Sequence, residues 1–186
     1  MNFSFRPVDP AADAALLHSW MRRDYARFWG MTHASASEVQ AEYTGIAVNP
    51  HHQAWLAQEE GVPAFLAESY DPAHSPLAGT YPIQPGDLGM HVLMGPPDRP
   101  RSGYTTAALE ALLDFLFENP AVERIVVEPD VRNTKIHALN ARMGFEPQSR
   151  IELPDKTALL SFCTRAQFRA ARRTTPADSQ PKGASA

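Results

Sequence analysis

Two side chains, His91 and Asp130, have the chemistry to move a proton at a shared site. His91 lies within the otherwise apolar run 88–94, and Asp130 follows the short apolar run 124–128. Imidazole exchanges a proton near neutral pH. If the two runs form neighbouring parallel strands, their carboxyl ends meet at one edge of a sheet, where ligands bind. A hydrogen-bonded core histidine is the common alternative, and it stays open at this point.

The segment 99–106, Arg-Pro-Arg-Ser-Gly-Tyr-Thr-Thr, is a candidate phosphate-binding loop. It lies between the first of these runs and a long amphipathic pattern, so it presents unpaired backbone N–H groups at a helix N-terminus. The helix dipole favours a pyrophosphate there. Gly103 permits a close approach of the backbone, and Arg99 or Arg101 adds positive charge. An ordinary turn and helix cap fit the same residues.

The elements that position these residues begin with two predicted helices. Asp9 and Pro10 fit the N-cap and first turn of a helix that continues to about residue 25. Ser35 and Glu38 predict a capping box, which starts a second helix toward residue 46. The first quarter of the chain is therefore predicted to be helical.

A hairpin and a crossover are predicted in the middle of the chain. The runs 53–58 and 62–70 flank the turn signal Glu60-Gly61, and a proline-rich loop over 71–86 leads to the strand 88–94. A leucine stripe predicts a helix over 105–118, before a strand at 124–128. Strand, loop, helix and strand in this order predict two parallel neighbours.

The last third is predicted to complete a mixed sheet. Asn133 is expected to cap a helix, and Gly144 to end that helix in the left-handed conformation. Strands follow at about 149–153 and 157–163, and then a terminal helix at 165–173. Residues 174–186 contain almost no large apolar side chain, which predicts disorder. We predict one domain over residues 1–173 and a disordered tail over 174–186.

Composition restricts the class of protein. The 186 residues include one cysteine, Cys163, so an internal disulfide or a zinc cluster of cysteines is not expected, and a cytoplasmic location fits. No secretion signal or membrane span is recognisable. The net charge of −4 argues against a nucleic-acid binder and favours small-molecule partners. Monomer and homodimer both remain open.

Several short motifs together resemble one enzyme family. They are Gly89-Met90-His91, the run Glu-Pro-Asp-Val-Arg-Asn at 128–133, Leu139-Asn140, Gly144-Phe145 and the run at 153–158. In combination they resemble the siderophore-biosynthesis branch of the Gcn5-related N-acetyltransferase (GNAT) superfamily, over most of residues 3–168. The resemblance implies a single-domain α/β (α+β) GNAT fold. In that fold a mixed, mostly antiparallel sheet is flanked by helices, and a parallel strand pair splays apart at the cofactor crevice.

The resemblance also implies a reaction. An acyl group passes from acetyl-CoA, succinyl-CoA or a related acyl-CoA to the hydroxylamine of an N-hydroxylated diamine or lysine, with N-hydroxycadaverine favoured. The hydroxamate product is a precursor for iron chelation. Acyl-CoA is the co-substrate, and no metal is expected. His91 and Asp130 are assigned to the acceptor pocket, where either could receive the proton and Asp130 could instead orient the imidazole.

The predicted cofactor contacts follow from the same resemblance: Met94, Arg99, Arg101, Ser102, Gly103, Tyr104, Thr105, Asn133 and Asn140. Only Gly103 matches the family's phosphate-loop pattern strictly, because Pro100 and Thr105 occupy two of its other key positions. Asn140 stands where many relatives carry the tyrosine that protonates the departing thiolate. That proton donor is therefore unassigned, and solvent is a candidate.

The predicted acceptor contacts are Phe28, Trp29, Glu68, Tyr70 and Tyr81. Glu68 would meet the distal ammonium of a diamine, while aromatic rings line its alkyl chain. Roles in the core or on a strand surface remain open for each, and Lys156 is expected to be a solvated charge. Two other functions remain: an acetyltransferase for ordinary amines or aminoglycosides, and a non-catalytic acyl-CoA-binding module.

Overall fold

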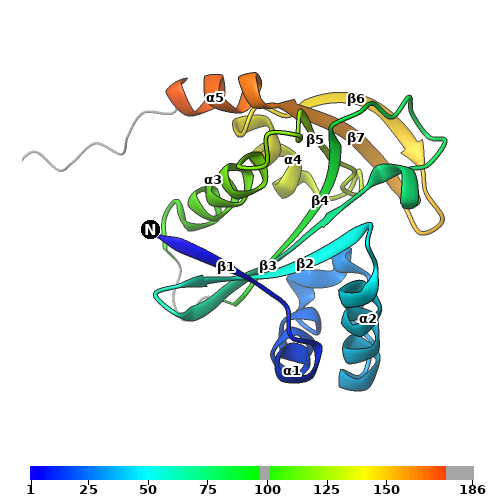
Figure 1. Ribbon diagram of the computed structural model, residues 1–186, viewed down its shortest axis with the longest axis vertical. Helices are drawn as coiled ribbons and strands as arrows, with labels where there is room; N and C mark the ends of the chain where they lie inside the picture. Colours follow the sequence, from blue (N-terminus) through cyan, green and yellow to red (C-terminus); the bar gives the residue numbers. More distant parts are fainter. Residues whose placement is uncertain (97–100, 175–186) are drawn as a thin grey trace, which may run out of the picture.

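A single seven-stranded sheet forms the centre of the molecule in the computed structural model, which describes residues 1–96 and 101–174 (Figure 1). Its strand order is β1-β2-β3-β4-β5-β7-β6. The strands are β1 (Phe3–Pro7), β2 (His52–Glu59), β3 (Val62–Tyr70), β4 (Asp87–Met94), β5 (Arg124–Val127), β6 (Glu146–Glu152) and β7 (Thr157–Thr164). The helices are α1 (Pro10–Met21), α2 (Ala36–Val48), α3 (Tyr104–Phe117), α4 (Thr134–Arg142), α5 (Arg165–Thr174) and the short 3-10 helices η1 (Asp24–Trp29) and η2 (Pro72–His74).

The sheet is mixed and mostly antiparallel, as predicted, and β4 and β5 form its parallel pair. The register of this pair runs only over Asp87–Gly89 of β4, opposite residues 124–126. On its other side β4 stays paired with β3 as far as Met94. The two parallel strands therefore separate after Gly89, and the sheet opens at the place where a crevice was expected.

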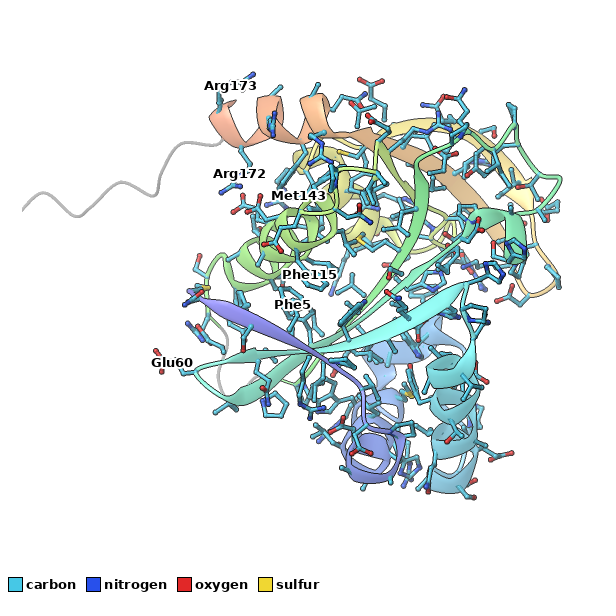
Figure 2. All side chains as sticks on the ribbon, viewed as in Figure 1. Phe5, Glu60, Phe115, Met143, Arg172 and Arg173 are labelled. Atoms are coloured by element: carbon cyan, nitrogen blue, oxygen red, sulfur yellow. The ribbon has the colours of Figure 1, made fainter. Side chains whose placement is uncertain are left out.

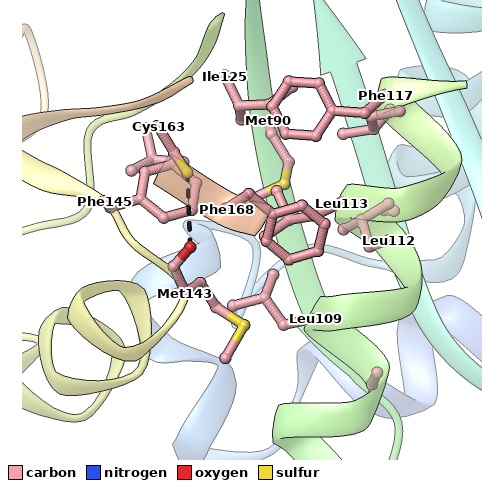
Figure 3. Packing of buried hydrophobic residues seen from close by; sticks show 14 of the residues in the cluster. Met90, Leu109, Leu112, Leu113, Phe117, Ile125, Met143, Phe145, Cys163 and Phe168 are labelled. Atoms are coloured by element: carbon pink, nitrogen blue, oxygen red, sulfur yellow. Dashed lines mark hydrogen bonds between the residues drawn. The ribbon is translucent and has the colours of Figure 1, made fainter. Parts of the chain in front are cut away.

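Helices cover both faces of the sheet (Figure 1). Side chains of β3 alternate between the faces, because successive residues of a strand point to opposite sides. Phe65 and Ala67 pack in the cluster that includes α3, whereas Leu66 packs in the cluster of α1 and α2. Figure 3 shows part of the larger cluster, in which the Cys163 thiol donates a hydrogen bond to the carbonyl of Met143 at 3.5 Å. The sheet is therefore held rigidly from both sides.

The helix caps near the N-terminus are confirmed, but the prediction of a wholly helical first quarter is wrong. Asp9 accepts hydrogen bonds from the first turn of α1, and Ser35 forms the capping box of α2. However, residues 3–7 form the edge strand β1, and α1 ends at Met21 before η1 begins. Phe5 of β1 stacks on Phe115 of α3, with ring centroids 4.3 Å apart (Figure 2). An alternation over five residues is too short to outweigh the helix signals that follow it.

Most other boundaries agree with the sequence, with one correction in side-chain detail. Gly144 ends α4 with a φ of 91°, as expected. Asn133 occupies the N-cap position of α4, but its side chain makes no capping hydrogen bond. Arg99 and the predicted tail from residue 175 onward lie outside the described residues. Within residues 1–96 and 101–174, no helix has the length and apolar character needed to cross a membrane.

Gly89 allows the ring of Tyr70 to lie against the backbone of β4. A Cβ atom at position 89 would be 2.1 Å from Cε2 of this ring. The ring is buried and its hydroxyl is hydrogen-bonded, so it cannot move without loss of other contacts. We expect Gly89→Ala to reduce the free energy of unfolding by about 1–3 kcal/mol, the usual effect of overpacking. Urea denaturation measures this change.

Gly45→Ala is the matched control. A Cβ atom at position 45 of α2 would have nothing within 4 Å, and alanine is favoured over glycine in a helix by about 1 kcal/mol. This control should therefore be as stable as the wild type or more stable. Equal stability of both variants would show that the contact between position 89 and Tyr70 does not matter.

Candidate active site

A cavity of about 490 Å³ opens where β4 and β5 separate. It contains both residues predicted to move a proton, His91 and Asp130. It also contains five of the predicted substrate and cofactor residues, namely Phe28, Trp29, Glu68, Asn133 and Asn140. The aromatic pair comes from η1, whereas Asn133 and Asn140 come from the N-cap and the body of α4. Residues far apart in the sequence therefore meet around one space.

Tyr70 and Tyr81, both predicted to contact the acceptor, do not line this cavity, and Tyr70 lines the smaller cavity beside it. Tyr81 has other contacts. The hydroxyl of Tyr81 donates a hydrogen bond to Asp87 at 3.0 Å, and the ring of Tyr81 packs against Phe162. Asp87 also binds the guanidinium of Arg124. Tyr81 thus supports the start of β4, and its contact with the acceptor stays a prediction.

The imidazole of His91 lies between two carboxylates. Its Nε2 is 2.5 Å from Oε1 of Glu128, and its Nδ1 is 3.4 Å from Oε2 of Glu68. The antiparallel register of β3 and β4 places Glu68 directly opposite His91, while Glu128 follows the last residue of β5. The hydroxyl of Tyr70 donates to the second oxygen of Glu128 at 2.7 Å. Three neighbouring strands therefore build this cluster.

Glu68 is only 7% exposed, and side chains from several elements contact its carboxylate. Tyr43 of α2 donates a hydrogen bond to Oε1 at 2.8 Å, and Nε2 of His52 lies 3.3 Å from Oε2. These contacts were not foreseen, because they depend on how α2 and β2 pack against β3. They fix one carboxylate at the wall of the cavity.

The positive charge of His91 and the negative charges of Glu68 and Glu128 stabilise each other at neutral pH. Burial favours the neutral form of His91, but the charges and hydrogen bonds of Glu128 and Glu68 outweigh it and raise the pKa of His91 from 6.5 to about 10. Burial likewise opposes ionisation of Glu128, but the charge of His91 lowers the pKa of Glu128 to about 2. In the free protein His91 is therefore a cation held between two anions, which corrects the expectation of an imidazole that titrates near neutrality.

Asp130 lines the same cavity but does not orient the imidazole. Both of its carboxylate oxygens contact the guanidinium of Arg132, the shortest distance being 2.5 Å. The hydrogen bonds from Arg132 lower the pKa of Asp130 to about 2. Glu128 is the carboxylate that contacts His91. From its sequence context Glu128 is predicted only to end a strand, and its place in the motif at 128–133 is the one signal of a further role.

Lys156 is not the solvated charge that was expected. Its side chain is 17% exposed, and Nζ is 3.6 Å from Oε1 of Glu128. The residue lies in the turn between β6 and β7, and the backbone N–H of Leu153 donates to its carbonyl. The turn therefore places a second cation near Oε1 of Glu128, the oxygen that also contacts Nε2 of His91.

The predicted phosphate loop is described from residue 101 onward. Gly103 has a φ of 73° and is the N-cap of α3, without a side-chain hydrogen bond. Arg101 forms an ion pair with Glu59, at 2.5 Å, and its guanidinium lies over the ring of Tyr104. Ser102 and Thr105 are exposed. Met94, also predicted to bind cofactor, accepts a hydrogen bond from Tyr25 through its carbonyl.

Comparison with known families decides the class of protein. Residues 9–153 match the acetyltransferase (GNAT) domain family. The chain belongs to the GNAT acetyltransferase family. The GNAT resemblance of the motifs is thereby confirmed, together with the fold and the class of enzyme, an acyltransferase.

Relatives of this GNAT acyltransferase include enzymes for two classes of acceptor. It is 28% identical over 167 residues to the N-hydroxyputrescine acetyltransferase of Acinetobacter baumannii, which covers 90% of this chain and 80% of the relative. It is also 28% identical over 166 residues to an aminoglycoside N(6')-acetyltransferase of Serratia marcescens, covering 87% and 83%. Sequence identity alone therefore does not indicate which class of acceptor this enzyme uses.

A solved structure supports the same fold. The crystal structure of the aminoglycoside acetyltransferase AAC(6')-Ib in complex with coenzyme A superposes on this GNAT acyltransferase with a TM-score of 0.80. The superposition covers 92% of this chain and 99% of that one, at 24% sequence identity. At this identity the likeness concerns the fold.

Proposed function

We propose that this GNAT acyltransferase acylates the hydroxylamine nitrogen of an N-hydroxylated diamine or lysine, with N-hydroxycadaverine favoured, and forms a hydroxamate for siderophore biosynthesis. One observation carries the proposal: a single cavity joins the aromatic wall of Phe28 and Trp29 to the buried carboxylates of Glu68 and Glu128. Such a cavity suits a short alkyl chain with one cationic end. The motifs of this branch and the Acinetobacter baumannii relative support the same acceptor class.

The acceptor has a natural orientation in this cavity. Glu68 attracts the distal ammonium, and the rings of Phe28 and Trp29 cover the methylene groups. The reactive nitrogen then lies on the side of His91 that faces the opening between β4 and β5. Tyr70, whose hydroxyl is bound to Glu128, keeps the His91 pair in place from β3. An aminoglycoside, the second candidate, carries several ammonium groups and hydroxyls and gains little from an aromatic wall.

Binding of this cation prepares His91 for proton transfer. The ammonium of the acceptor, bound beside Glu68, neutralises part of the negative charge that holds the proton on His91. A neighbouring positive charge also lowers the pKa of a histidine. In the ternary complex His91 therefore loses its proton more readily and becomes a base. General-base catalysis of this kind is worth about 10²- to 10⁴-fold in rate.

The reaction itself is then a balanced acyl transfer. The hydroxylamine nitrogen attacks the thioester carbonyl carbon, and its proton passes to His91 as the new C–N bond forms. A backbone N–H in the part of β4 beyond its pairing with β5 donates a hydrogen bond to the negatively charged oxygen of the tetrahedral intermediate and stabilises it. Collapse of the intermediate breaks the C–S bond, and the CoA thiolate takes its proton from solvent. Asn140 lines the cavity but has no acidic proton to give.

Acyl-CoA, as acetyl-CoA, succinyl-CoA or a related thioester, is proposed to reach the cavity from the α3 and α4 side. The uncapped N-terminus of α3 offers its N–H groups to the pyrophosphate, together with the predicted contacts at Arg101, Ser102, Gly103, Tyr104 and Thr105. Met94, the last residue of β4, is the remaining predicted contact. Asn133 and Asn140 are proposed to contact the pantetheine arm, and their position in the lining of the cavity supports this.

Thiol release tests the proposal directly. Acetyl-CoA and succinyl-CoA are each incubated with N-hydroxycadaverine, cadaverine or kanamycin, and free thiol is followed over time. We expect rapid release only with the hydroxylated diamine, and product of hydroxamate mass. Preference for kanamycin would establish the aminoglycoside alternative. Tight CoA binding without turnover of any amine would instead identify a non-catalytic binding module.

Asp130→Asn separates the two candidate proton acceptors. The carboxylate of Asp130 is occupied by Arg132, and its pKa of about 2 makes it a weak base. We therefore expect a decrease in kcat/KM of less than about tenfold, well below the usual value of a general base. Steady-state rates with N-hydroxycadaverine measure it. A decrease of the full size expected for a general base would assign the proton transfer to Asp130.

A further inference from the structure

Two histidines and one aspartate meet outside the acceptor cavity. His51 immediately precedes β2, Asp71 immediately follows β3, and His74 belongs to η2. The side-chain ligand atoms of the three residues all lie within 4.8 Å of one another. The proposed acyl transfer uses none of them, and none of them belongs to the hydrophobic clusters of the core.

The three side chains converge on one oxygen. Oδ2 of Asp71 is 2.8 Å from Nδ1 of His74 and 3.6 Å from Nδ1 of His51. The two imidazole rings stack with their centroids 3.5 Å apart and their planes 6° apart. Two ring nitrogens on the same side of the stack therefore face the same carboxylate.

Backbone hydrogen bonds hold this arrangement before any ligand binds. The N–H of Asp71 donates to the carbonyl of His51 at 2.9 Å, and the N–H of His74 donates to the carbonyl of Asp71 at 3.0 Å. The other oxygen of Asp71 accepts a hydrogen bond from the N–H of Ala73 at 2.9 Å. The carboxylate is thus oriented by its own turn, which leaves Oδ2 for the histidines.

We propose that His51, Asp71 and His74 form a binding site for one divalent transition-metal ion such as Zn²⁺. Imidazole nitrogen with a single carboxylate oxygen is a donor set that suits zinc, copper and nickel better than magnesium or calcium. Bonds of about 2.0–2.2 Å to these atoms require ligand atoms about 3.4 Å apart in a tetrahedron. The observed separations from Asp71 to the two histidines, 2.8 and 3.6 Å, bracket that value. An imidazole nitrogen binds a metal in the plane of its ring, so one of the two stacked rings must rotate to bind the same ion, and the exposed side chain of His74 has the space to do so.

The bound ion would lie at the wall of a second cavity. His51 and His74 line a side cavity of about 230 Å³, which His91 and Glu128 line as well. Three protein ligands leave at least one position of a tetrahedral ion open. The site therefore presents positive charge and a free coordination position to the cavity that adjoins the His91 pair. This placement does not depend on which acceptor the enzyme uses.

Metal binding to the untagged full chain tests the site without an activity assay. Isothermal titration with ZnCl₂ should show one ion per chain. His51→Ala and His74→Ala should each weaken binding by about 100-fold, because loss of even a group that supports a ligand costs 10- to 100-fold. Asp71→Asn should also weaken it. His33→Ala, at an exposed histidine outside the cluster, should bind like the wild type.

Cobalt substitution identifies the ligands. Co²⁺ at this site should give visible absorption bands typical of nitrogen and oxygen ligands, which disappear in the His74→Ala variant. Thermal unfolding without metal should be unchanged in the alanine variants, since the side chains of His51 and His74 are 40% and 52% exposed. The proposal is overturned if the wild type holds no stoichiometric zinc, if the variants keep its affinity, or if the cobalt spectrum shows the thiolate of Cys163.

Discussion

Replacing His91 by alanine is expected to lower kcat/KM with N-hydroxycadaverine by about 10²- to 10⁴-fold at alkaline pH, the usual effect of losing a general base. The loss should be smaller at neutral pH, because a pKa of about 10 leaves little neutral imidazole in the free wild-type enzyme. The ratio of wild-type to variant rates should therefore grow as pH rises. Thiol release measured between pH 6.5 and pH 10 gives this ratio.

His18→Ala is the matched control, because His18 lies in α1 and outside the cavity. It should keep the wild-type rate at every pH. His91→Ala also leaves Glu68 and Glu128 facing each other without the imidazolium, and the rates must be compared below its unfolding temperature. A folded His91→Ala variant with wild-type kcat/KM at pH 9 would remove His91 from the mechanism.

Local signals in the sequence were sufficient for most of the scaffold. Asp9, Ser35 and Gly144 mark helix ends through contacts within a few residues, so their roles are legible without the fold. The order of strand, helix and strand after residue 87 predicts the parallel pair for the same reason, since short connections restrict the topology. The edge strand β1 was missed because its pairing partner, β2, lies some fifty residues away.

The partners of the candidate base depend on pairing between strands, and this is where prediction from sequence ended. His91 was recognised from its own type and setting, but its neighbours come from the register of β3 and from the end of β5. Glu128 and Lys156 gain their roles only when β5 and the turn between β6 and β7 lie side by side. Asp130 is the carboxylate that the sequence favours as the partner of His91, because a carboxylate just after a strand is a common ligand position. In the structure Glu128, two residues earlier, binds the imidazole instead.

Glu128→Gln is expected to change both the rate and its pH dependence. Loss of the carboxylate removes the largest attraction that holds the proton on His91, so the pKa of His91 should fall from about 10 toward its ordinary value of 6.5. The rise of kcat/KM with pH should then occur about 1–3 units lower, which is the usual influence of one adjacent opposite charge. The limiting rate at high pH should fall about 100-fold, because the ring is no longer held in position.

Glu118→Gln, at an exposed position after α3, provides the control and should keep the wild-type profile. The presence of a shift distinguishes a protein group beside Glu128 from a group of the substrate. If the hydroxylamine of the substrate were responsible for the rise in kcat/KM, its titration would be the same in wild type and Glu128→Gln, and the profiles would differ in height alone. A shift to lower pH requires a group beside Glu128. Three titratable groups contact Glu128: Nε2 of His91 at 2.5 Å, the hydroxyl of Tyr70 at 2.7 Å and Nζ of Lys156 at 3.6 Å. His91→Ala distinguishes among them, because it alone removes the imidazole, whereas the carboxylate of Asp130 is occupied by Arg132. An unshifted profile in the folded variant would therefore contradict the assignment of His91 as the base.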